Sequence, residues 1–599
     1  MKFKIDMLQK VIQLFIFLIF SFGFSMQKKQ QKPPNVILIL ADDLGIGDLG
    51  CQGNPWLKTP EIDAFYNEAI RMTDFHVSAL CTPTRAAIMT GQFPINNGAW
   101  ATFKGRDALS ENAITMADVF KGNGYNTGLF GKWHLGDNFP SRPTDSGFDR
   151  VVQHLGGGVG ELSDYWGNSY FDDVYYVNNQ PKQFEGYCTD VWFKEATRFI
   201  DLNKEEPFFV YLPLNAPHDP LIVAEKYAAP YKKLEGKDII SANLYGMIAN
   251  IDENFGKFYQ YLEKQNLLEN TILIFMSDNG TRFGYSKDGK LGFNKGFRGI
   301  KGDEEEGAHR VPFFIRWPKG NIQGGKDIPN LTAHVDLIPT LASLCNLTLP
   351  EQMTLDGTDF SSVFSSKETA VQNRSMSLHN RQDWRPPHDI ASTCIIKNQW
   401  RLIDGKELYN IDKDPKQEIN LAETYPELVT ELLQENTIFI NAAKLSTAYK
   451  ELPVTVVGNN AQLETKLTIQ HAIGEDVGIW KCEQVADGIK NTNNTHALRI
   501  AQEGEYLISL RRWPKECSGA IRGIPKENPK NSFQYKNISP TKAKISIANQ
   551  MHEKPILEGD EEVVFKVHLQ KGKTFLVNDF IENETNYGVY YTYINKVAE

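Results

Sequence analysis

Four runs of apolar residues in the first half of this chain contain no regular polar alternation. Uninterrupted runs of this length are typical of strands buried on both faces, as in a parallel sheet. Helical periodicity between them, for example over residues 242–262, predicts crossover helices on both faces. We therefore predict an α/β fold with a large mixed, mainly parallel sheet sandwiched by helices. The runs lie at residues 35–41, 125–130, 208–214 and 271–276.

Each of these runs ends in charged or amide side chains. Because ligands of parallel sheets bind beyond the carboxyl ends of the strands, these side chains are expected to meet at one site. This convergence is the main structural prediction from the sequence. The polar groups that follow the four runs are Asp42 with Asp43, Lys132 with His134, Asn215 with His218, and Asp278 with Asn279.

The 599 residues exceed what one compact core holds, so several domains are expected. We predict an α/β catalytic domain over residues 33–380 and a small α+β subdomain over 381–445. In the subdomain, a capping box from Thr424 to Glu427 predicts a helix that ends near Ile440. From residue 450 to 599 the period changes to two, which predicts an all-β, sandwich-like accessory domain.

The N-terminus has the layout of a secretory signal peptide over residues 1–25. Three lysines precede an apolar stretch over 11–24, and small residues follow it. This predicts a secreted or periplasmic protein without stable membrane insertion after cleavage; an uncleaved signal anchor is the alternative. The net charge of −10 and the lack of a long basic run argue against nucleic acid as a partner.

The chain has seven cysteines, an odd number that points to at least one thiol with a separate role. Cys482 and Cys517 could pair, but the sequence leaves the connectivity open. Cys81 lies just before Pro83, which suits the first turn of a helix. A cysteine at a helix N-terminus, one turn from Arg85, predicts a low-pKa thiolate nucleophile.

The acidic and amide residues predict a metal site. Asp42, Asp43, Asp278 and Asn279 offer only oxygen atoms as ligands. Hard oxygen donors suit Ca²⁺ or Mg²⁺, whereas zinc would favour histidine or cysteine.

The motifs together resemble those of the formylglycine-dependent sulfatases, arylsulfatase-like members of the alkaline phosphatase superfamily. The resemblance covers about residues 34–440 and leaves the region beyond 450 outside. In chain order, the matching motifs are Asp42-Asp43, Cys81-Thr-Pro-Thr-Arg85, Gly131-Lys132-Trp133-His134, Asn215-Ala-Pro-His218, Ser277-Asp278-Asn279-Gly280 and Lys301 with Glu306-Gly307 and Arg310-Val311-Pro312.

The resemblance implies a set of roles. Cys81 would be oxidised to 3-oxoalanine (formylglycine) by a formylglycine-generating maturation enzyme. Ca²⁺, with Mg²⁺ less favoured, would bind Asp42, Asp43, modified Cys81, Asp278 and Asn279. Arg85, Lys132 and Lys301 would hold the sulfuryl oxygens, and Asp278 would assist attack by the hydrated aldehyde. His218, with Lys301, would protonate the departing sugar oxygen, and His134 would take the second hydroxyl proton, releasing sulfate.

The predicted function is that of an exported sulfuric ester hydrolase in sulfated polysaccharide degradation, acting on a polysaccharide or its oligosaccharides. His154, Arg381 and Trp384 are candidate contacts to this sulfated glycan, since such side chains bind sugars. The domain beyond 450 could bind carbohydrate or shape the rim of the pocket. Two alternatives stay open: a phosphate or phosphonate ester hydrolase on the same fold, and a catalytically inactive glycan-binding homologue.

Overall fold

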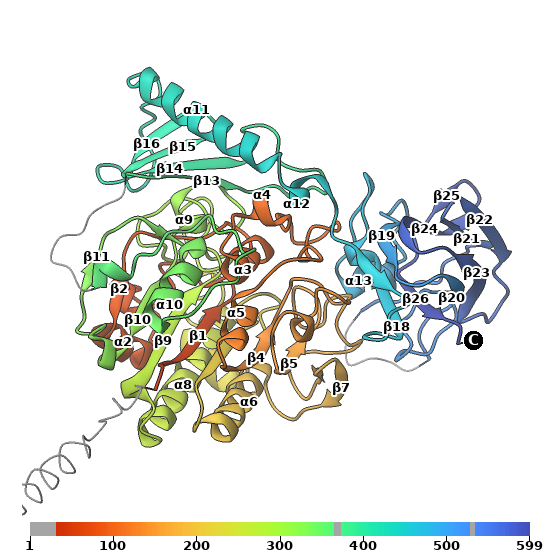
Figure 1. Cartoon of the computed structure of the whole chain (residues 1–599), viewed down its shortest axis with the longest axis horizontal. Coiled ribbons are helices and arrows are strands. Elements are labelled where there is room, and N and C mark those ends of the chain that lie inside the picture. The colour runs from red at the N-terminus through yellow and green to blue at the C-terminus, as the bar shows by residue number, and fades with distance from the viewer. Residues whose placement is uncertain (1–31, 365–372, 527–532, 599) are drawn as a thin grey trace, which may run out of the picture.

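The computed structural model describes residues 32–364, 373–526 and 533–598. The predicted signal peptide over residues 1–25 lies outside these ranges. In Figure 1 a small sheet with a long helix lies above the α/β core, and a separate β domain that holds the C-terminus lies to the right of the core. Within the described ranges, no helix has the length and apolar character needed to cross a membrane.

The core is built on a ten-stranded sheet. Its centre is β1 (Asn35–Ala41), which pairs in parallel with β8 (Phe208–Pro213) on one side and β9 (Thr271–Ser277) on the other. Strand β4 (Asn126–Lys132) continues the parallel order next to β8, and β10 (Phe313–Arg316) runs antiparallel to β9. The four apolar runs are therefore adjacent strands, and the predicted mixed, mainly parallel sheet is confirmed.

Helices cover both faces of this sheet. In β1, Ile37 and Ile39 point into one apolar core, while Val36, Leu38 and Leu40 point into the other. This alternation is why the strand is apolar throughout, since successive side chains enter opposite layers. The first core is closed by α2 (Pro60–Glu68), α6 (Cys188–Asn203) and α8 (Ala242–Lys264); the second is closed by α3 (Cys81–Thr90), α5 (Met116–Gly122) and α10 (Leu337–Cys345).

The small subdomain is a four-stranded antiparallel sheet packed against the helix α11 (Pro426–Ala443). The predicted capping box at Thr424 is wrong. The helix is preceded by Tyr425 without a side-chain cap, and the Thr424 N–H is already bonded to the Leu421 carbonyl in a turn. Its strands are β13 (Ser375–His379), β14 (Thr393–Lys397), β15 (Trp400–Ile403) and β16 (Glu407–Asn410).

The C-terminal region is an all-β domain with two sheets around one apolar core, as predicted. Cys482 is buried and carries a free thiol, so the pairing with Cys517 that the sequence left open is not formed. One sheet contains β17 (Thr455–Val457), β19 (Thr495–Ile500), β21 (Lys542–Ile547), β22 (Gln550–Pro555), β24 (Gly572–Glu582) and β25 (Thr585–Asn586); the other contains β18 (Glu464–Thr468), β20 (Gly504–Arg511), β23 (Glu562–Leu569) and β26 (Tyr591–Lys596).

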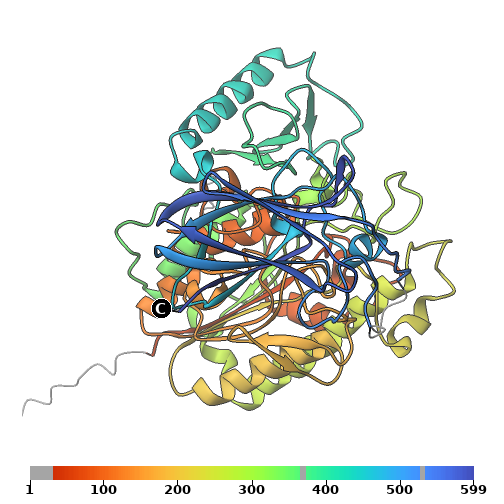
Figure 2. The ribbon, with the colours of Figure 1, turned by 90° about the vertical axis from the view of Figure 1, so that its right-hand side faces the viewer.

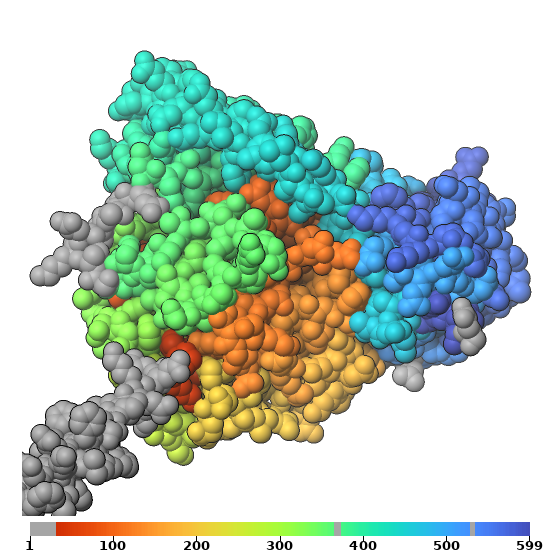
Figure 3. Space-filling model, in the orientation of Figure 1, coloured from red at the N-terminus to blue at the C-terminus, as the bar shows by residue number. Residues whose placement is uncertain are grey.

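The β domain packs directly against the core, in front of it in Figure 2 and along the orange segments in Figure 3. His471 is the polar centre of this contact. Its Nδ1 lies 2.6 Å from Asp107 Oδ2 and its Nε2 lies 3.1 Å from Asp137 Oδ2. Both carboxylates belong to the core. Their negative charge raises the pKa of His471 well above its usual range, although burial alone would lower it.

We predict that His471→Asn lowers the free energy of unfolding by about 2–3 kcal/mol at acidic pH, because two charged hydrogen bonds between the domains are lost. An imidazole whose pKa is raised in the folded protein contributes its full stability at a pH below the pKa of the unfolded state, about 6.5. This contribution is lost as the pH rises through the pKa of the folded state. The difference between wild type and variant in urea unfolding should therefore shrink at alkaline pH.

The matched control is His568→Asn, which removes an exposed histidine beside Glu503 and Glu505 within the β domain. This variant should stay within about 0.5 kcal/mol of wild type at every pH, as expected for exposed ion pairs. Equal effects of the two substitutions would contradict the role given to His471.

Candidate active site

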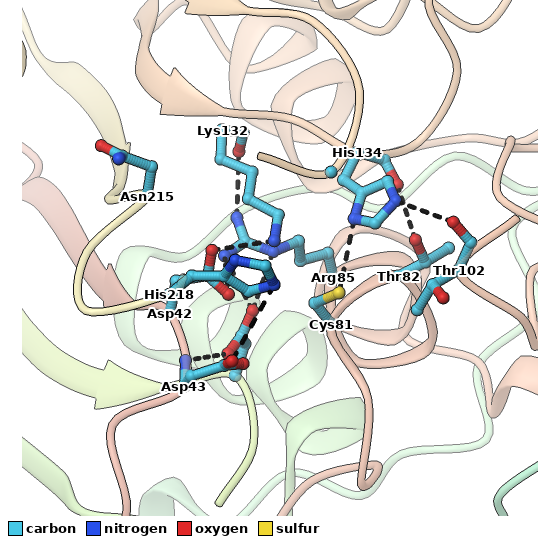
Figure 4. A network of polar contacts seen from close by, with 12 residues as sticks. Asp42, Asp43, Cys81, Thr82, Arg85, Thr102, Lys132, His134, Asn215 and His218 are labelled. Atoms are coloured by element: carbon cyan, nitrogen blue, oxygen red, sulfur yellow. Dashed lines mark hydrogen bonds and ion pairs between the residues drawn. The ribbon is translucent and has the colours of Figure 1, made fainter. Parts of the chain in front are cut away.

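The carboxyl ends of β1 and β9 bring four oxygen-bearing side chains together. Since Ala41 pairs with Ser277, the residues that follow the two strands are neighbours. The Asp43 N–H donates to Asp278 Oδ1 at 3.1 Å, and Asn279 Nδ2 donates to Asp43 Oδ1 at 2.8 Å. Asp42, Asp43, Asp278 and Asn279 are all buried, and Figure 4 shows Asp42 and Asp43 within the polar network.

Three buried cations neutralise these carboxylates. Lys132 Nζ lies 2.8 Å from Asp42 Oδ2, and Lys301 Nζ lies 2.6 Å from Asp43 Oδ1. Arg85 donates from Nε and Nη2 to Asp278 Oδ2, at 3.0 and 2.7 Å. Each carboxylate thus has its own cation, which is the arrangement that makes buried charge tolerable.

The residues present fit a hard cation. Asp42 Oδ1, Asp43 Oδ2 and Asn279 Oδ1 are buried and lack a hydrogen-bond partner among the described residues. Buried oxygens without a partner are costly, so these atoms are suited to an ion. Ligand atoms of Asp42, Asp43 and His218 lie within 4.8 Å of one another. Burial and the charge of Asp42 also raise the pKa of Asp278 to about 6, a repulsion that a divalent cation would relieve.

Cys81 is the first residue of α3 and lies beside this cluster. The predicted low-pKa thiolate is wrong, because burial raises the pKa of the Cys81 thiol and outweighs the attraction of Lys132 and Lys301. Its Sγ lies 3.4 Å from Nδ1 of His134, toward which it points in Figure 4. The thiol sulfur therefore marks where a group on the Cβ atom of residue 81 would meet His134.

Hydrogen bonding fixes the tautomer of His134. Its Nε2 lies 3.0 Å from the carbonyl oxygen of Thr102. Because a carbonyl can only accept, Nε2 carries the proton and Nδ1 presents its lone pair to Cys81. Burial, with Lys132 and Arg85, holds the pKa of His134 well below its usual range, so the ring is neutral and able to accept a proton.

His218 follows β8 on the other side of Cys81. Its Nδ1 donates to the carbonyl of Asp219 at 2.6 Å, which leaves Nε2 facing Asp43 Oδ2 at 3.9 Å. The hydroxyl of Tyr170 donates to the His218 carbonyl at 3.2 Å and fixes this turn. Burial and Lys301 lower the pKa of His218.

A cavity of about 690 Å³ opens above Cys81, and His134, His218 and Lys301 also reach it. Its walls come from all three parts of the chain. Gln382 of the small subdomain is held in place by the Thr102 N–H, which donates to its Oε1 at 2.9 Å. The other wall residues with long polar or aromatic side chains include Phe103, Glu161 and Arg282 of the core and Gln470, Trp480 and Lys481 of the β domain.

These wall residues were not found from the sequence, because no motif or periodicity distinguishes them. The three residues that the sequence predicted as sugar contacts have other surroundings. His154 is fully buried with its ring near Trp192 at 6.2 Å, and Arg381 pairs with Asp389 at 3.2 Å. Neither of them lines the cavity, and nor does Trp384, although Gln382 between Arg381 and Trp384 does.

The fold and this cluster define an α/β protein that can hold a hard cation beside an anion at its strand ends. The sulfatase family profile matches residues 34–347, more than half of the chain, and the profile of the N-sulphoglucosamine sulphohydrolase C-terminal region matches residues 304–439. The chain therefore belongs to the sulfatase family, and the family predicted from the motifs is confirmed.

Curated relatives match the same part of the chain. An arylsulfatase of Hemicentrotus pulcherrimus is 34% identical in an alignment 350 residues long that covers 54% of this chain and 60% of the relative. The steryl-sulfatase of Rattus norvegicus is 30% identical in an alignment 410 residues long that covers 54% of this chain and 69% of the relative. The chain thus spans about 60 to 70% of the length of these proteins.

Solved structures extend the likeness to the fold. The crystal structure of Ps i-CgsB is 30% identical, with a TM-score of 0.61 over 68% of this chain and 93% of that one. The structure of Ps i-CgsB in complex with k-i-k-neocarrahexaose is 29% identical, with a TM-score of 0.62 over 71% of this chain and 96% of that one.

We predict that Ca²⁺ raises the melting temperature of the protein and that a chelator lowers it again, since an ion that binds only the folded state stabilises it by mass action. Asp42→Asn should abolish this shift, because it removes one charged oxygen ligand. Asp288→Asn, which changes an exposed loop carboxylate, serves as the control and should leave the shift intact. A shift that survives Asp42→Asn would place the ion elsewhere.

Proposed function

We propose that this protein is an exported sulfatase that hydrolyses sulfate esters of a sulfated carbohydrate. The position of Cys81, on the floor of a cavity between unpartnered carboxylate oxygens and buried cations, is the observation that carries the proposal. Membership of the sulfatase family and the likeness to a structure that binds a neocarrahexaose support it. A secreted or periplasmic location follows the N-terminal signal-peptide pattern.

Two groups would complete the site. Cys81 would be matured to 3-oxoalanine, whose hydrate would supply the attacking hydroxyl. Asp42, Asp43, residue 81, Asp278 and Asn279 would hold Ca²⁺, which would supply positive charge at the sulfuryl oxygens. The oxygen-only side chains of the two strand ends support a hard cation over zinc.

The cations position the sulfate. Lys132 and Lys301 each contact one carboxylate, and both lie close enough to residue 81 for their charge to lower the pKa of its thiol against the effect of burial. Arg85 holds Asp278 and also donates from Nη1 to the Lys132 carbonyl at 3.0 Å. Since such donors are fixed before the reaction, they stabilise developing charge without reorganisation.

The two histidines carry the protons. His134 Nδ1 faces residue 81 and would take a proton from a hydroxyl there. His218, together with Lys301, lines the cavity and would protonate the departing sugar oxygen. Asp278 is less suited to act as the base, because both of its oxygens already accept hydrogen bonds, from the Asp43 N–H and from Arg85.

We predict that Cys81→Ala lowers kcat on sulfate esters by at least about 100-fold, because the group that attacks sulfur is removed. Protein made with the maturation enzyme should show an aldehyde in the mass spectrum of the peptide around residue 81. Cys51→Ala, at a half-buried thiol outside the cavity, is the matched control and should keep its activity. Native-rate hydrolysis by Cys81→Ala would refute the proposal.

The same assay distinguishes the alternatives. A sulfatase should turn over 4-nitrophenyl sulfate much faster than the corresponding phosphate mono- and diesters, whereas a phosphate or phosphonate ester hydrolase would show the opposite order. An inactive glycan-binding homologue would show no turnover of any ester while retaining an unmodified thiol at residue 81.

We predict that His218→Ala slows hydrolysis of sugar sulfates by about 100-fold or more but affects 4-nitrophenyl sulfate much less. The reason is that a nitrophenolate leaves without protonation, whereas a sugar alkoxide requires an acid. His388→Ala, an exposed histidine outside the cavity, is the control. Equal losses on both substrates would show that His218 acts in binding or structure and not as the acid.

A further inference from the structure

One wall of the cavity comes from residues 480–483 of the β domain, a segment beyond both family profiles, the later of which ends at residue 439. The segment is bonded to the core. The Leu162 N–H donates to the Trp480 carbonyl at 3.0 Å, and Glu161 forms an antiparallel bridge with Lys481. These backbone bonds fix the segment at the cavity, so its side chains have defined positions.

Two aromatic rings, one from each domain, meet at this wall. The centroids of Phe103 and Trp480 lie 5.4 Å apart with an interplanar angle of 39°. A Cβ atom at Gly478 would lie 2.7 Å from Phe103 Cε2, so the glycine allows the two domains to approach. Trp480 stays 37% exposed, and among the exposed large apolar side chains of the described residues it is the one tryptophan. A partly open aromatic face in a cavity is suited to stacking on a sugar ring.

A fixed polar pair lies beside the rings. Glu161 Oε2 accepts from the Gly157 N–H and from Gln470 Nε2, both at 3.0 Å. Gln470 Oε1 in turn accepts from the Ser163 N–H at 3.2 Å. In the described part of the chain no hydrogen bond goes to Glu161 Oε1, which is therefore available to a ligand hydroxyl.

This pair is close to the reacting centre. A Cβ atom at Gly157 would lie 2.6 Å from His134 Cε1 and 3.0 Å from Glu161 Oε2. One glycine thus separates Glu161 from the histidine that faces Cys81. A ligand bound at the sulfate position would extend past Gly157 toward the rings.

We propose that Phe103, Trp480, Glu161 and Gln470 form a subsite for an uncharged sugar unit adjoining the sulfated position. The inference rests on the proposed sulfatase function. The sugar ring stacks on the aromatic pair while a ring hydroxyl donates to Glu161. A carboxylate in the wall accepts from hydroxyl groups and repels sulfate or uronate, so the unit at this subsite is unsulfated. Arg282 and Lys481 also line the cavity, and Arg282 is partly neutralised by Asp219 at 3.6 Å.

The first experiment compares kcat/KM on two substrates. These are the sulfated oligosaccharide that wild type hydrolyses fastest, from a panel that includes k-i-k-neocarrahexaose, and 4-nitrophenyl sulfate. Trp480→Ala should lower the ratio of the two values by about tenfold, whereas Trp480→Phe should keep most of it, because a ring remains for stacking. Phe575→Ala, which removes an exposed aromatic of the same domain outside the cavity, should leave the ratio unchanged.

The second experiment tests the charge. Glu161→Gln keeps the shape of the side chain and removes its negative charge. Two substrates are compared, one of which carries an extra sulfate on the adjoining sugar. The kcat/KM of the more sulfated substrate, relative to that of the less sulfated one, should rise about tenfold in this variant. An unchanged ratio in either Trp480→Ala or Glu161→Gln would overturn the subsite as proposed, and equal losses on both substrates in Trp480→Ala count as an unchanged ratio.

The two levels of proposal fail differently. If wild type hydrolyses no sulfate ester, the proposed function fails, and the subsite is then tested by calorimetric binding of k-i-k-neocarrahexaose to Cys81→Ala with and without Trp480→Ala. Weaker binding with the second substitution supports the subsite; equal or absent binding overturns it. If wild type hydrolyses 4-nitrophenyl sulfate but none of the oligosaccharides, the subsite and the carbohydrate substrate are refuted, whereas the sulfatase activity stands.

Discussion

Repulsion among Asp42, Asp43 and Asp278 is the constraint on which the rest of this site depends. Two adjacent parallel strands end in these carboxylates, and three buried cations neutralise them. The cations come from α3, β4 and the segment after β9, so the charge balance joins segments far apart in the sequence. The oxygens that remain without partners then define where an ion can bind. The apolar sheet supports this cluster because strands that are buried on both faces hold their ends in a fixed register.

The cavity above this cluster is a joint product of core, small subdomain and β domain. The core supplies the groups that contact residue 81, whereas the β domain supplies part of the wall. The contacts that hold the domain in place, at His471 and along residues 161–162, lie close to that wall. Family membership therefore accounts for the chemistry at the floor, while the shape of the opening depends on a domain outside the family profiles.

The central sheet could be predicted because each buried strand shows as an unbroken apolar run that stops at polar residues. The cluster could be predicted because Asp42, Asp278 and Lys132 stand directly at those stops. Three other features of the structure could not be predicted from the sequence. The Cys81 thiol does not have the low pKa expected at a helix N-terminus, since burial is a tertiary property. The turn before α11 already uses the Thr424 N–H. Trp480 reaches the cavity through domain packing, which no local pattern encodes.

The Thr102 carbonyl that fixes the His134 tautomer belongs to a loop that contacts the core, the small subdomain and the β domain. Its own N–H is held by Gln382 of the small subdomain, and the next residue, Phe103, contacts Trp480 of the β domain. The position of the proton on the His134 ring is thus set by a loop that the small subdomain and the β domain hold in place. Substitutions in the small subdomain or the β domain can for this reason change how the His134 ring is held without altering any residue of the charge cluster.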